Sequence, residues 1–312
     1  MKKLIALILL MGVALTFSAC GDKNGKKPVT TTEPESNVPE ITLQEVYEAG
    51  KSYLALLGDH ESVYIKVTSN GAVLNEAYYT KQYSCSYYSA EYMNMGFEFY
   101  SFTTDHSEYV CFDGTYAFNA TFDENGMMDM ADSFAGEGTK SFISSDVASD
   151  PNATIVEKDG YITVTCIADA ETLELIGNNV TSCVETYTLD AKTREMLSVK
   201  TVYTYEDGTV EEGVATITRD VEMPEGMKAF LNYDNESENL RTVTFVSNPG
   251  EDNEKVDTVQ LACGLGISVS PYWEIEEMLD MYTDAECTQP FVEDDLNSDV
   301  TVYLKWSVFV EE

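Results

Sequence analysis

An alternation of apolar and polar side chains recurs in this chain from residue 76 to residue 219. Over 76–88 and 91–102, tyrosine, phenylalanine and other apolar residues alternate with polar ones. A period of two places the apolar side chains on one face of a strand. We therefore predict consecutive antiparallel strands with their other face exposed to water.

A hairpin is predicted between EYVCF and TYAFN, because the pair Asp113-Gly114 between them is typical of a two-residue turn. Pairing through that turn predicts one common face for Tyr109, Cys111, Tyr116 and Phe118. After a less regular stretch from 124 to 152, alternation resumes in four further segments up to residue 220. The chain is thus predicted to be mainly antiparallel β.

Two helices are predicted beside these strands. Residues 41–58 show helical spacing of apolar residues, with Thr42 and Glu45 in a capping-box pattern and Gly58 at the expected end. A short helix is predicted over 169–177, with Asp169 as its cap. With these helices the predicted fold class is α+β.

The polar, unpatterned segment 231–240 predicts a linker before a second domain, 241–312. In that domain RTVTFVSNPG, DTVQLACG and DVTVYLKWSVFV are predicted strands, while YWEIEEMLDMY fits either a strand or a helix. The last strand has one face built for burial, formed by Val300, Val302, Leu304 and Trp306.

The N-terminus is typical of an export signal, with Lys2 and Lys3 before an apolar run over 4–17. The following TFSAC resembles the lipobox of bacterial lipoproteins, which implies a signal peptide over 1–19 and a lipid on Cys20. A plain secretory cleavage is the alternative. Residues 20–40, rich in proline and polar residues, then form a flexible tether. The expected location is the outer side of a bacterial cell membrane, held by the lipid.

Residues 41–230 resemble the LolA-like family of bacterial lipoprotein carriers in the order of their elements and in their turns. The matching turn and closing residues are Leu189, Asp190, Lys192, Thr193, Asp207, Gly208 and Pro224. The resemblance implies an incomplete β-barrel packed with a helix around an apolar cavity. The candidates for lining that cavity are Tyr79, Tyr83, Met93, Met95, Phe97 and Phe99. Ordinary core packing of the same residues is the alternative.

Residues 241–307 are similar to the Listeria-Bacteroides repeat, also called the internalin B-type repeat. One match is the turn segment Tyr282, Thr283, Asp284, Ala285, Glu286, Cys287, Thr288, Pro290 and Phe291. The other is the closing strand Thr301, Val302, Tyr303, Leu304, Lys305 and Trp306. Asp280 and Met281 depart from the Gly-Trp that the repeat usually has. The resemblance implies a small β-grasp-like domain that serves as a spacer or contacts a surface protein or glycan.

The acidic balance of the chain limits its partners. It has 18 Lys and Arg against 55 Asp and Glu, a formal net charge of −37. Nucleic acids and anionic lipid head groups are polyanions, so neither is an expected partner. An apolar fraction of 44% is still enough to bury a core.

Six cysteines follow Cys20, an even number in an exported chain. The domain boundaries favour disulfides between Cys263 and Cys287 and between Cys166 and Cys183, leaving Cys85 and Cys111. Free buried thiols are the alternative.

The sequence offers little that points to catalysis. Its two histidines, His60 and His106, lie in polar turns, and the common nucleophile, phosphate-loop and metalloprotease motifs are absent. The acidic pairs and runs at 123–124 and 293–295 fit solvated turns better than a weak Ca²⁺ site. We therefore predict no enzyme, no cofactor and no metal. The predicted function is a membrane-anchored surface lipoprotein that binds a hydrophobic or lipid-linked ligand, and the alternative is an adhesion or structural protein.

Overall fold

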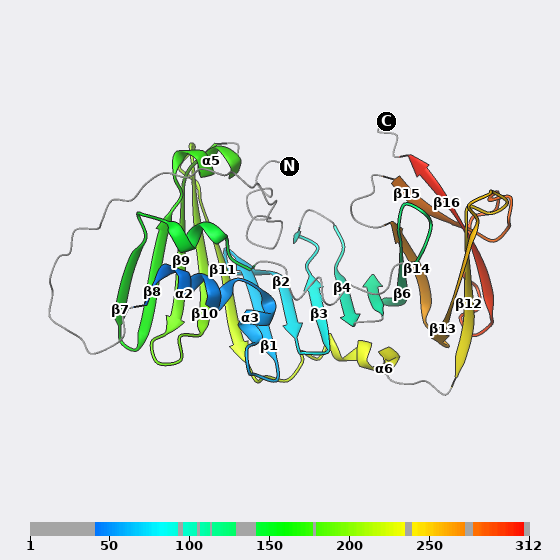
Figure 1. Ribbon diagram of the computed structural model, residues 1–312, viewed down its shortest axis with the longest axis horizontal. Coiled ribbons are helices and arrows are strands. Elements are labelled where there is room, and N and C mark those ends of the chain that lie inside the picture. Colours follow the sequence, from blue (N-terminus) through cyan, green and yellow to red (C-terminus); the bar gives the residue numbers. More distant parts are fainter. Residues whose placement is uncertain are drawn as a thin grey trace. The chain divides into compact units, whose positions relative to one another are not determined.

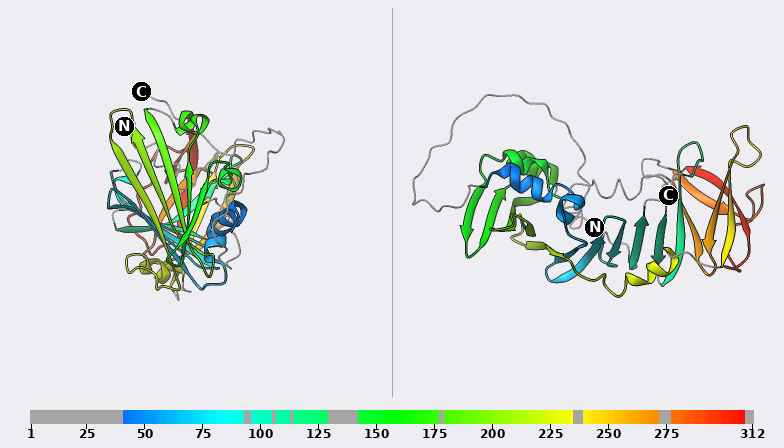
Figure 2. Two further views of the ribbon diagram at one scale, coloured as in Figure 1. Left: turned by 90° about the vertical axis from the view of Figure 1, so that its left-hand side faces the viewer. Right: turned by 60° about the horizontal axis from the view of Figure 1, so that its bottom comes forward.

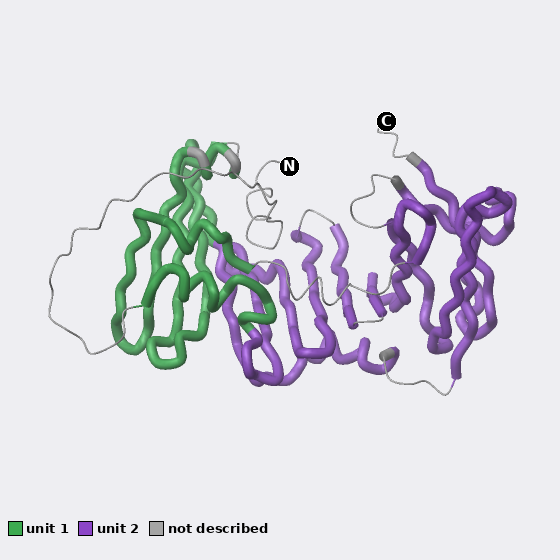
Figure 3. The backbone as a smooth tube through the Cα atoms, viewed as in Figure 1, with its two compact units in different colours: residues 1–56, 140–212 green, residues 57–139, 213–312 purple. Residues whose placement is uncertain are grey.

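The computed structural model describes residues 41–92, 96–104, 107–112, 114–128, 142–176, 179–234, 239–271 and 277–308 (Figure 1). The chain divides into two compact units, one of residues 1–56 and 140–212 and the other of residues 57–139 and 213–312 (Figure 3). We call them unit 1 and unit 2. The domain boundaries predicted from the sequence stay predictions.

In its described residues, unit 1 contains two helices, a 3₁₀ turn and four strands. They are α2 (Leu43–Gly50), η3 (Ser145–Ser149), β7 (Thr154–Lys158), β8 (Tyr161–Ile167), α5 (Ala170–Ile176), β9 (Val180–Asp190) and β10 (Met196–Tyr205). The strands pair in the order β10-β9-β8-β7. Two elements cross the boundary between the units, α3 (Tyr53–Leu57) and β11 (Val210–Arg219).

Unit 2 contains most of the strands. Its first half has β1 (Val63–Ser69), β2 (Ala72–Tyr79), β3 (Tyr83–Tyr88), β4 (Phe99–Thr104), β5 (Glu108–Phe112) and β6 (Thr115–Phe122). Its second half has η4 (Lys228–Phe230), α6 (Leu231–Asp234), β12 (Leu240–Ser247), β13 (Lys255–Ala262), β14 (Gly266–Pro271), β15 (Glu277–Tyr282) and β16 (Val300–Val308). The pairing orders are β14-β6-β5-β4-β3-β2-β1-β11 and β13-β12-β16-β15.

Helix α2 of unit 1 begins as the sequence predicts. Thr42 and Glu45 form the capping box, in which the Glu45 N–H donates to the Thr42 hydroxyl at 3.2 Å and the Thr42 N–H donates to Glu45 at 2.7 Å. The predicted single helix over 41–58 is instead two helices, α2 and α3, with a break at residues 51–52. In Figure 2, α2 crosses one face of the strands of unit 1, and its Val46 side chain is fully buried.

The core of unit 2 draws on both of its sheets. One face of β3–β6 carries Cys85, Phe102, Tyr109 and Phe118 in direct cross-strand register. Against this face lies Phe230 of η4, whose ring is stacked on Phe102 with centroids 5.7 Å apart. The four-stranded sheet adds buried Val243, Phe245, Leu261, Val302 and Leu304 to the same cluster. The predicted buried face of the last strand is thus confirmed.

The predicted fold class, an incomplete β-barrel packed with a helix and followed by a small β-grasp-like domain, is wrong. The described chain is mostly β, and twelve of its strands follow one pairing order that begins at β14 and ends at β7. The order is open at both ends, so these strands form no closed barrel. The reason lies partly in β14, which pairs in parallel with β6 from Gly266 opposite Ala117 to Pro271 opposite Phe122. Residues of the predicted second domain therefore extend the large sheet.

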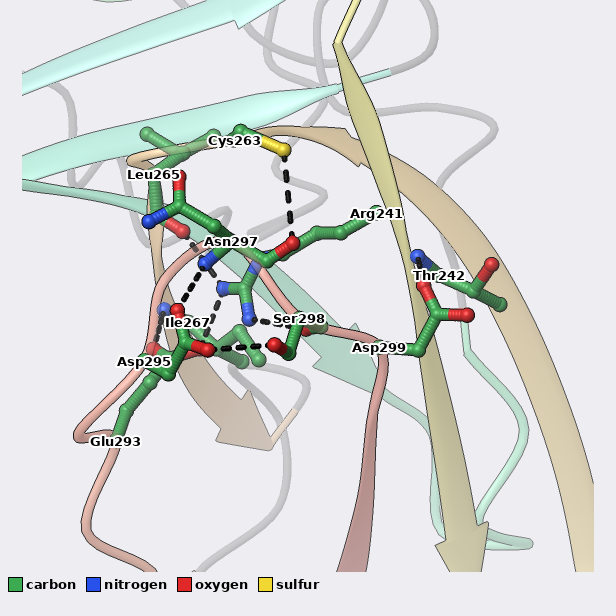
Figure 4. Close-up of polar contacts among 10 residues, drawn as sticks. All are labelled: Arg241, Thr242, Cys263, Leu265, Ile267, Glu293, Asp295, Asn297, Ser298 and Asp299. Carbon is green, nitrogen blue, oxygen red and sulfur yellow. Dashed lines mark hydrogen bonds and ion pairs between the residues drawn. The ribbon is translucent and has the colours of Figure 1, made fainter.

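A buried arginine fixes the connection between β15 and β16 (Figure 4). Arg241 of β12 is 1% exposed, and its guanidinium forms an ion pair with Glu293. Arg241 also donates to the Leu265 carbonyl at 2.7 Å, while Glu293 accepts from the Ile267 N–H at 3.0 Å. Because β12, the β13–β14 turn and β14 all converge on this ion pair, the acidic stretch at 293–295 acts as an internal anchor.

Candidate functional site

Aromatic side chains line up across β3, β4 and β5 of unit 2, on the face opposite to Cys85, Phe102 and Tyr109. Tyr88, Phe99 and Phe112 are direct cross-strand partners in these three strands. The Phe99 ring is stacked on Tyr88 with centroids 4.8 Å apart and on Phe112 with centroids 5.3 Å apart. These distances are close to the strand spacing of about 4.8 Å, so the pairing of the strands itself sets the stack.

Two further rings extend this stack. Tyr92 packs on Tyr88 with centroids 4.9 Å apart, and Phe97 meets Phe112 edge to face at 5.8 Å. Phe97 is 38% exposed and Phe112 is 39% exposed, which is unusual for two phenylalanines in contact. We call these five residues, Tyr88, Tyr92, Phe97, Phe99 and Phe112, the aromatic row.

The side chains next to the aromatic row on the same face are small. The neighbouring row across the strands is Ala77, Ser86, Ser101, Val110 and Ala117. Serine and alanine project much less far from a sheet than phenylalanine does. Ala77, Ser86, Val110 and Ala117 of this neighbouring row are themselves buried, at 4–8% exposed, so the solvent reaches this face mainly at the aromatic row.

The orientation of the rings decides what can contact them. The interplanar angles are 7° between Tyr88 and Phe99 and 14° between Phe99 and Phe112. Because the rings are stacked along the direction that joins the strands, each covers its neighbour's face and turns an edge toward the solvent. A sugar ring needs an open aromatic face, whereas an acyl chain or another apolar group can lie along ring edges.

The aromatic row carries no charge of its own near neutral pH. Burial raises the pKa of Tyr92, so its phenol stays protonated. On the opposite face of β3, the Tyr87 hydroxyl donates to Glu98 at 2.9 Å. Burial and then Glu98 raise the pKa of Tyr87 to about 12.

The structure separates the predicted cavity residues. Phe97 and Phe99 belong to the aromatic row, but Tyr83 packs into the core, 5.1 Å from Phe102. Tyr79 is 4% exposed and pairs with Ser84, so it lies on the opposite face from Tyr83. Met93 and Met95 lie outside the described residues.

A turn explains why the Tyr79 and Tyr83 side chains lie on opposite faces of the sheet. The sequence pattern runs through 76–88 as one strand, but the Thr80 hydroxyl accepts from the N–H groups of Gln82 and Tyr83, both at 3.1 Å. This turn ends β2 and begins β3. The sequence pattern also missed three residues of the aromatic row, Tyr88, Tyr92 and Phe112. The hairpin predicted from Asp113-Gly114 was the signal that could have placed Phe112. The structure pairs Phe112 with Thr115, while Asp113 itself lies outside the described residues.

The six cysteines in the described chain are free thiols, so neither predicted disulfide is present. Cys166 is paired with Glu185, which puts Cys183 at a diagonal position on the next strand. Such diagonal Cα atoms are about 7–8 Å apart, beyond the usual reach of a disulfide. Burial raises the pKa of Cys166 and of Cys183 to about 12 each, so both thiols are unreactive.

The other predicted disulfide would join two separate turns. The Cys263 thiol donates to the Asn297 carbonyl at 3.8 Å, and the Cys287 thiol contacts the Ala285 carbonyl at 4.0 Å. Each sulfur thus has a local backbone contact.

A second, acidic surface surrounds His60. Its Nδ1 lies 2.6 Å from Oδ2 of Asp220, and the Glu61 N–H donates to the other Asp220 oxygen at 3.0 Å. The adjoining cavity of about 660 Å³ is lined by Asp59, His60, Glu61, Ser62, Tyr78, Thr80, Asp220, Val221 and Glu222. The Ser62 hydroxyl donates to the Val221 carbonyl at 2.8 Å, so it satisfies a backbone acceptor just after the end of β11. His106 lies outside the described residues.

The acidic stretches are used within the fold. Asp123 accepts from the N–H groups of Asn125 and Met127, and Asp295 accepts from that of Asn297. Among the residues that the structure describes, no group of three or more His, Cys, Asp or Glu is arranged to hold a metal ion. In the same described part of the chain, no helix is long and apolar enough to cross a membrane.

Comparison with known proteins gives only distant likenesses. No protein-family model matches the chain, and no curated protein does. The resemblance to the Listeria-Bacteroides repeat therefore stays a prediction, as does the lipobox, since Cys20 lies outside the described residues.

Solved structures similar to this chain include LprF from Mycobacterium bovis, at 12% identity and a TM-score of 0.33, over 58% of this chain and 94% of LprF. A structure of MucB in complex with MucA matches at 15% identity and a TM-score of 0.22, over 59% of this chain and 56% of that chain. The Pseudomonas aeruginosa MucA/MucB complex matches at 13% identity and a TM-score of 0.24, over 70% and 75% of the two chains.

Proposed function

We propose that this chain is a lipid-anchored extracytoplasmic protein that binds a hydrophobic ligand on the aromatic row. The anchor is supported by the basic and apolar N-terminus and by Cys20 in TFSAC. The ligand site is supported by an observation that is independent of the anchor.

That observation is the stack of Tyr88, Phe99 and Phe112 across three strands, with Phe97 against its end. An ordinary solvated sheet face carries polar residues at such positions. Here two phenylalanines keep more than a third of their surface exposed, at 38% and 39%. Covering that surface with an apolar group is favourable by about 25 cal/mol per Å².

The charge of the chain narrows the ligand class. Its net charge of −37 repels anions, and removal of residues 1–19 takes away two lysines and makes the balance more acidic. An apolar ligand with an uncharged or cationic head group is therefore favoured over a fatty acid or another anionic lipid.

Binding of 1-N-phenylnaphthylamine, an uncharged apolar dye that fluoresces more strongly in apolar surroundings, tests the site. We expect Phe112→Ala and Phe97→Ala each to weaken binding about tenfold, since each removes apolar contact worth about 1.4 kcal/mol. Tyr161→Ala is the matched control, because it removes a ring that is 50% exposed but lies on β8, outside the aromatic row. Equal weakening by all three variants, or by none, would contradict the proposed site.

The anchor is tested separately by metabolic labelling with a lipid precursor in a bacterial host. We expect the wild-type chain to carry the label and Cys20→Ala to lose it. Equal labelling of the two chains would remove the anchor from the proposal and leave the aromatic row untouched.

A further inference from the structure

We propose that two copies of this chain associate edge to edge through β7, in an antiparallel pairing centred on Val156. This association is independent of the aromatic row. Strand β7 ends the pairing order of its sheet, and all five of its residues are exposed. Ile155 is 41% exposed and Val156 is 55% exposed. An exposed edge strand with apolar side chains is a template for another strand.

The hairpin geometry shows which backbone groups β7 offers. Asp159 and Gly160 form its two-residue turn, with φ of +54° and +83°, as a type I′ turn requires. Lys158 and Tyr161 flank this turn and pair with each other. Residues that flank such a turn exchange hydrogen bonds, and hydrogen-bonded pairs alternate along the ladder. Thr154, Val156 and Lys158 therefore bond to β8, while the N–H and C=O groups of Ile155 and Glu157 point to the open edge.

The sequence of β7 matches itself in one register. A twofold axis at Val156 places Ile155 opposite Glu157 of the second copy, and the outward backbone groups of these two residues then bond to each other on both sides of the axis. Thr154 lies opposite Lys158, and Val156 lies opposite its own copy in a pair without backbone bonds, where side chains approach most closely. All five residues are paired, and no like charges are directly opposed.

The neighbouring registers are poorer. An axis at Glu157 opposes the carboxylates of the two copies directly, which is destabilising. An axis at Ile155 leaves Lys158 without a partner strand. An axis midway between two residues would pair a residue whose backbone N–H and C=O groups point to the open edge with one whose groups already bond to β8. The β7 ladder also has no bulge and no proline, two of the devices that keep edge strands apart.

Cysteine cross-linking of the full chain tests this register, in excess detergent so that few micelles hold two chains. Val156→Cys places two thiols across the axis, and copper phenanthroline oxidises them to a disulfide. We expect a covalent dimer of twice the mass of the reduced chain. The matched control is Ile167→Cys, at a residue also 55% exposed on the same outer face, but on β8. Wild type gives the background of the native cysteines. Cross-linking of Val156→Cys no greater than that of Ile167→Cys would overturn the proposal.

A second variant tests the backbone pairing itself. Ile155→Pro removes an N–H that points to the open edge, so the β7–β8 ladder stays intact. We expect Ile155→Pro to sediment as a monomer at concentrations where wild type is dimeric, with an unchanged far-ultraviolet circular dichroism spectrum. A wild-type chain that sediments as a monomer throughout, together with no specific cross-link at residue 156, would refute the association.

Discussion

Asp220 joins two segments of unit 2 through one carboxylate, which contacts His60 and the Glu61 N–H. The hydrogen bond from His60 and then that from Glu61 lower the pKa of Asp220 from its ordinary value of 3.8. A carboxyl with a lowered pKa in the folded state stabilises the fold above its unfolded-state pKa, and the effect is lost as pH falls through the folded-state value.

We therefore expect Asp220→Asn to lower the melting temperature at pH 7, and the difference from wild type to vanish as the pH falls through the lowered folded-state pKa of Asp220. Asn tolerates the left-handed backbone at this position, where φ is +52°. Asp59→Asn removes the same charge from the same cavity without the His60 contact, and it should have a smaller effect at pH 7. Thermal unfolding at several pH values measures both, and a difference independent of pH would contradict the argument.

Loss of Arg241 should strongly destabilise unit 2. Its side chain is fully buried against Glu293, and removing one partner of a buried ion pair leaves the other charged and unpaired. We expect Arg241→Met to lower the free energy of unfolding by about 3–5 kcal/mol. Adding Glu293→Gln should recover part of that free energy, because it removes the carboxylate charge that Arg241→Met leaves buried and unpaired. Urea unfolding followed by tryptophan fluorescence measures both; a double variant as unstable as the sum of the singles would show that the two side chains do not interact.

Helix caps and hairpins, which depend on residues close together in the sequence, were predicted correctly. Strand pairings between residues far apart in the sequence were not predicted. The Thr42–Glu45 capping box, the hairpin pairing of EYVCF with TYAFN and the helix cap at Asp169 all depend on neighbours within a few residues, and each is confirmed. Strand β14 was missed, because its partner β6 lies about 150 residues earlier and no local pattern records a parallel pairing over that distance. The aromatic row was half found, since its alignment depends on the registers of three strands.

The segment that carries η4 is a second element that the sequence did not reveal. Phe230 is fully buried between Phe102 and Tyr116, with ring centroids 5.7 and 5.1 Å away. We expect Phe230→Ala to lower the free energy of unfolding by about 3–5 kcal/mol, and Phe230→Leu to cost clearly less because it leaves a smaller cavity. Chemical unfolding of the three chains measures this order. Equal loss for both variants would mean that cavity volume is not what destabilises them.

For the whole molecule, composition alone gave the class of the chain but not its architecture. An apolar fraction of 44% with a net charge of −37 indicates a folded protein with an acidic surface. It does not distinguish a barrel from an open sheet, because both satisfy the same alternation of side chains. The two proposals made here, an apolar ligand on β3–β5 and a second copy on β7, use different parts of that open arrangement and can fail independently.

The pairings of β1 with β11 and of β6 with β14 each join segments about 150 residues apart. Such long-range contacts must be formed against a large loss of chain entropy, and proteins that rely on them fold slowly. The sheet of unit 2 also cannot be completed until the ribosome has added residue 271. β1 keeps an open edge until β11 is complete at residue 219, and β6 keeps one until β14 is complete at residue 271. An open strand edge in the newly made chain is a template for pairing with a wrong partner.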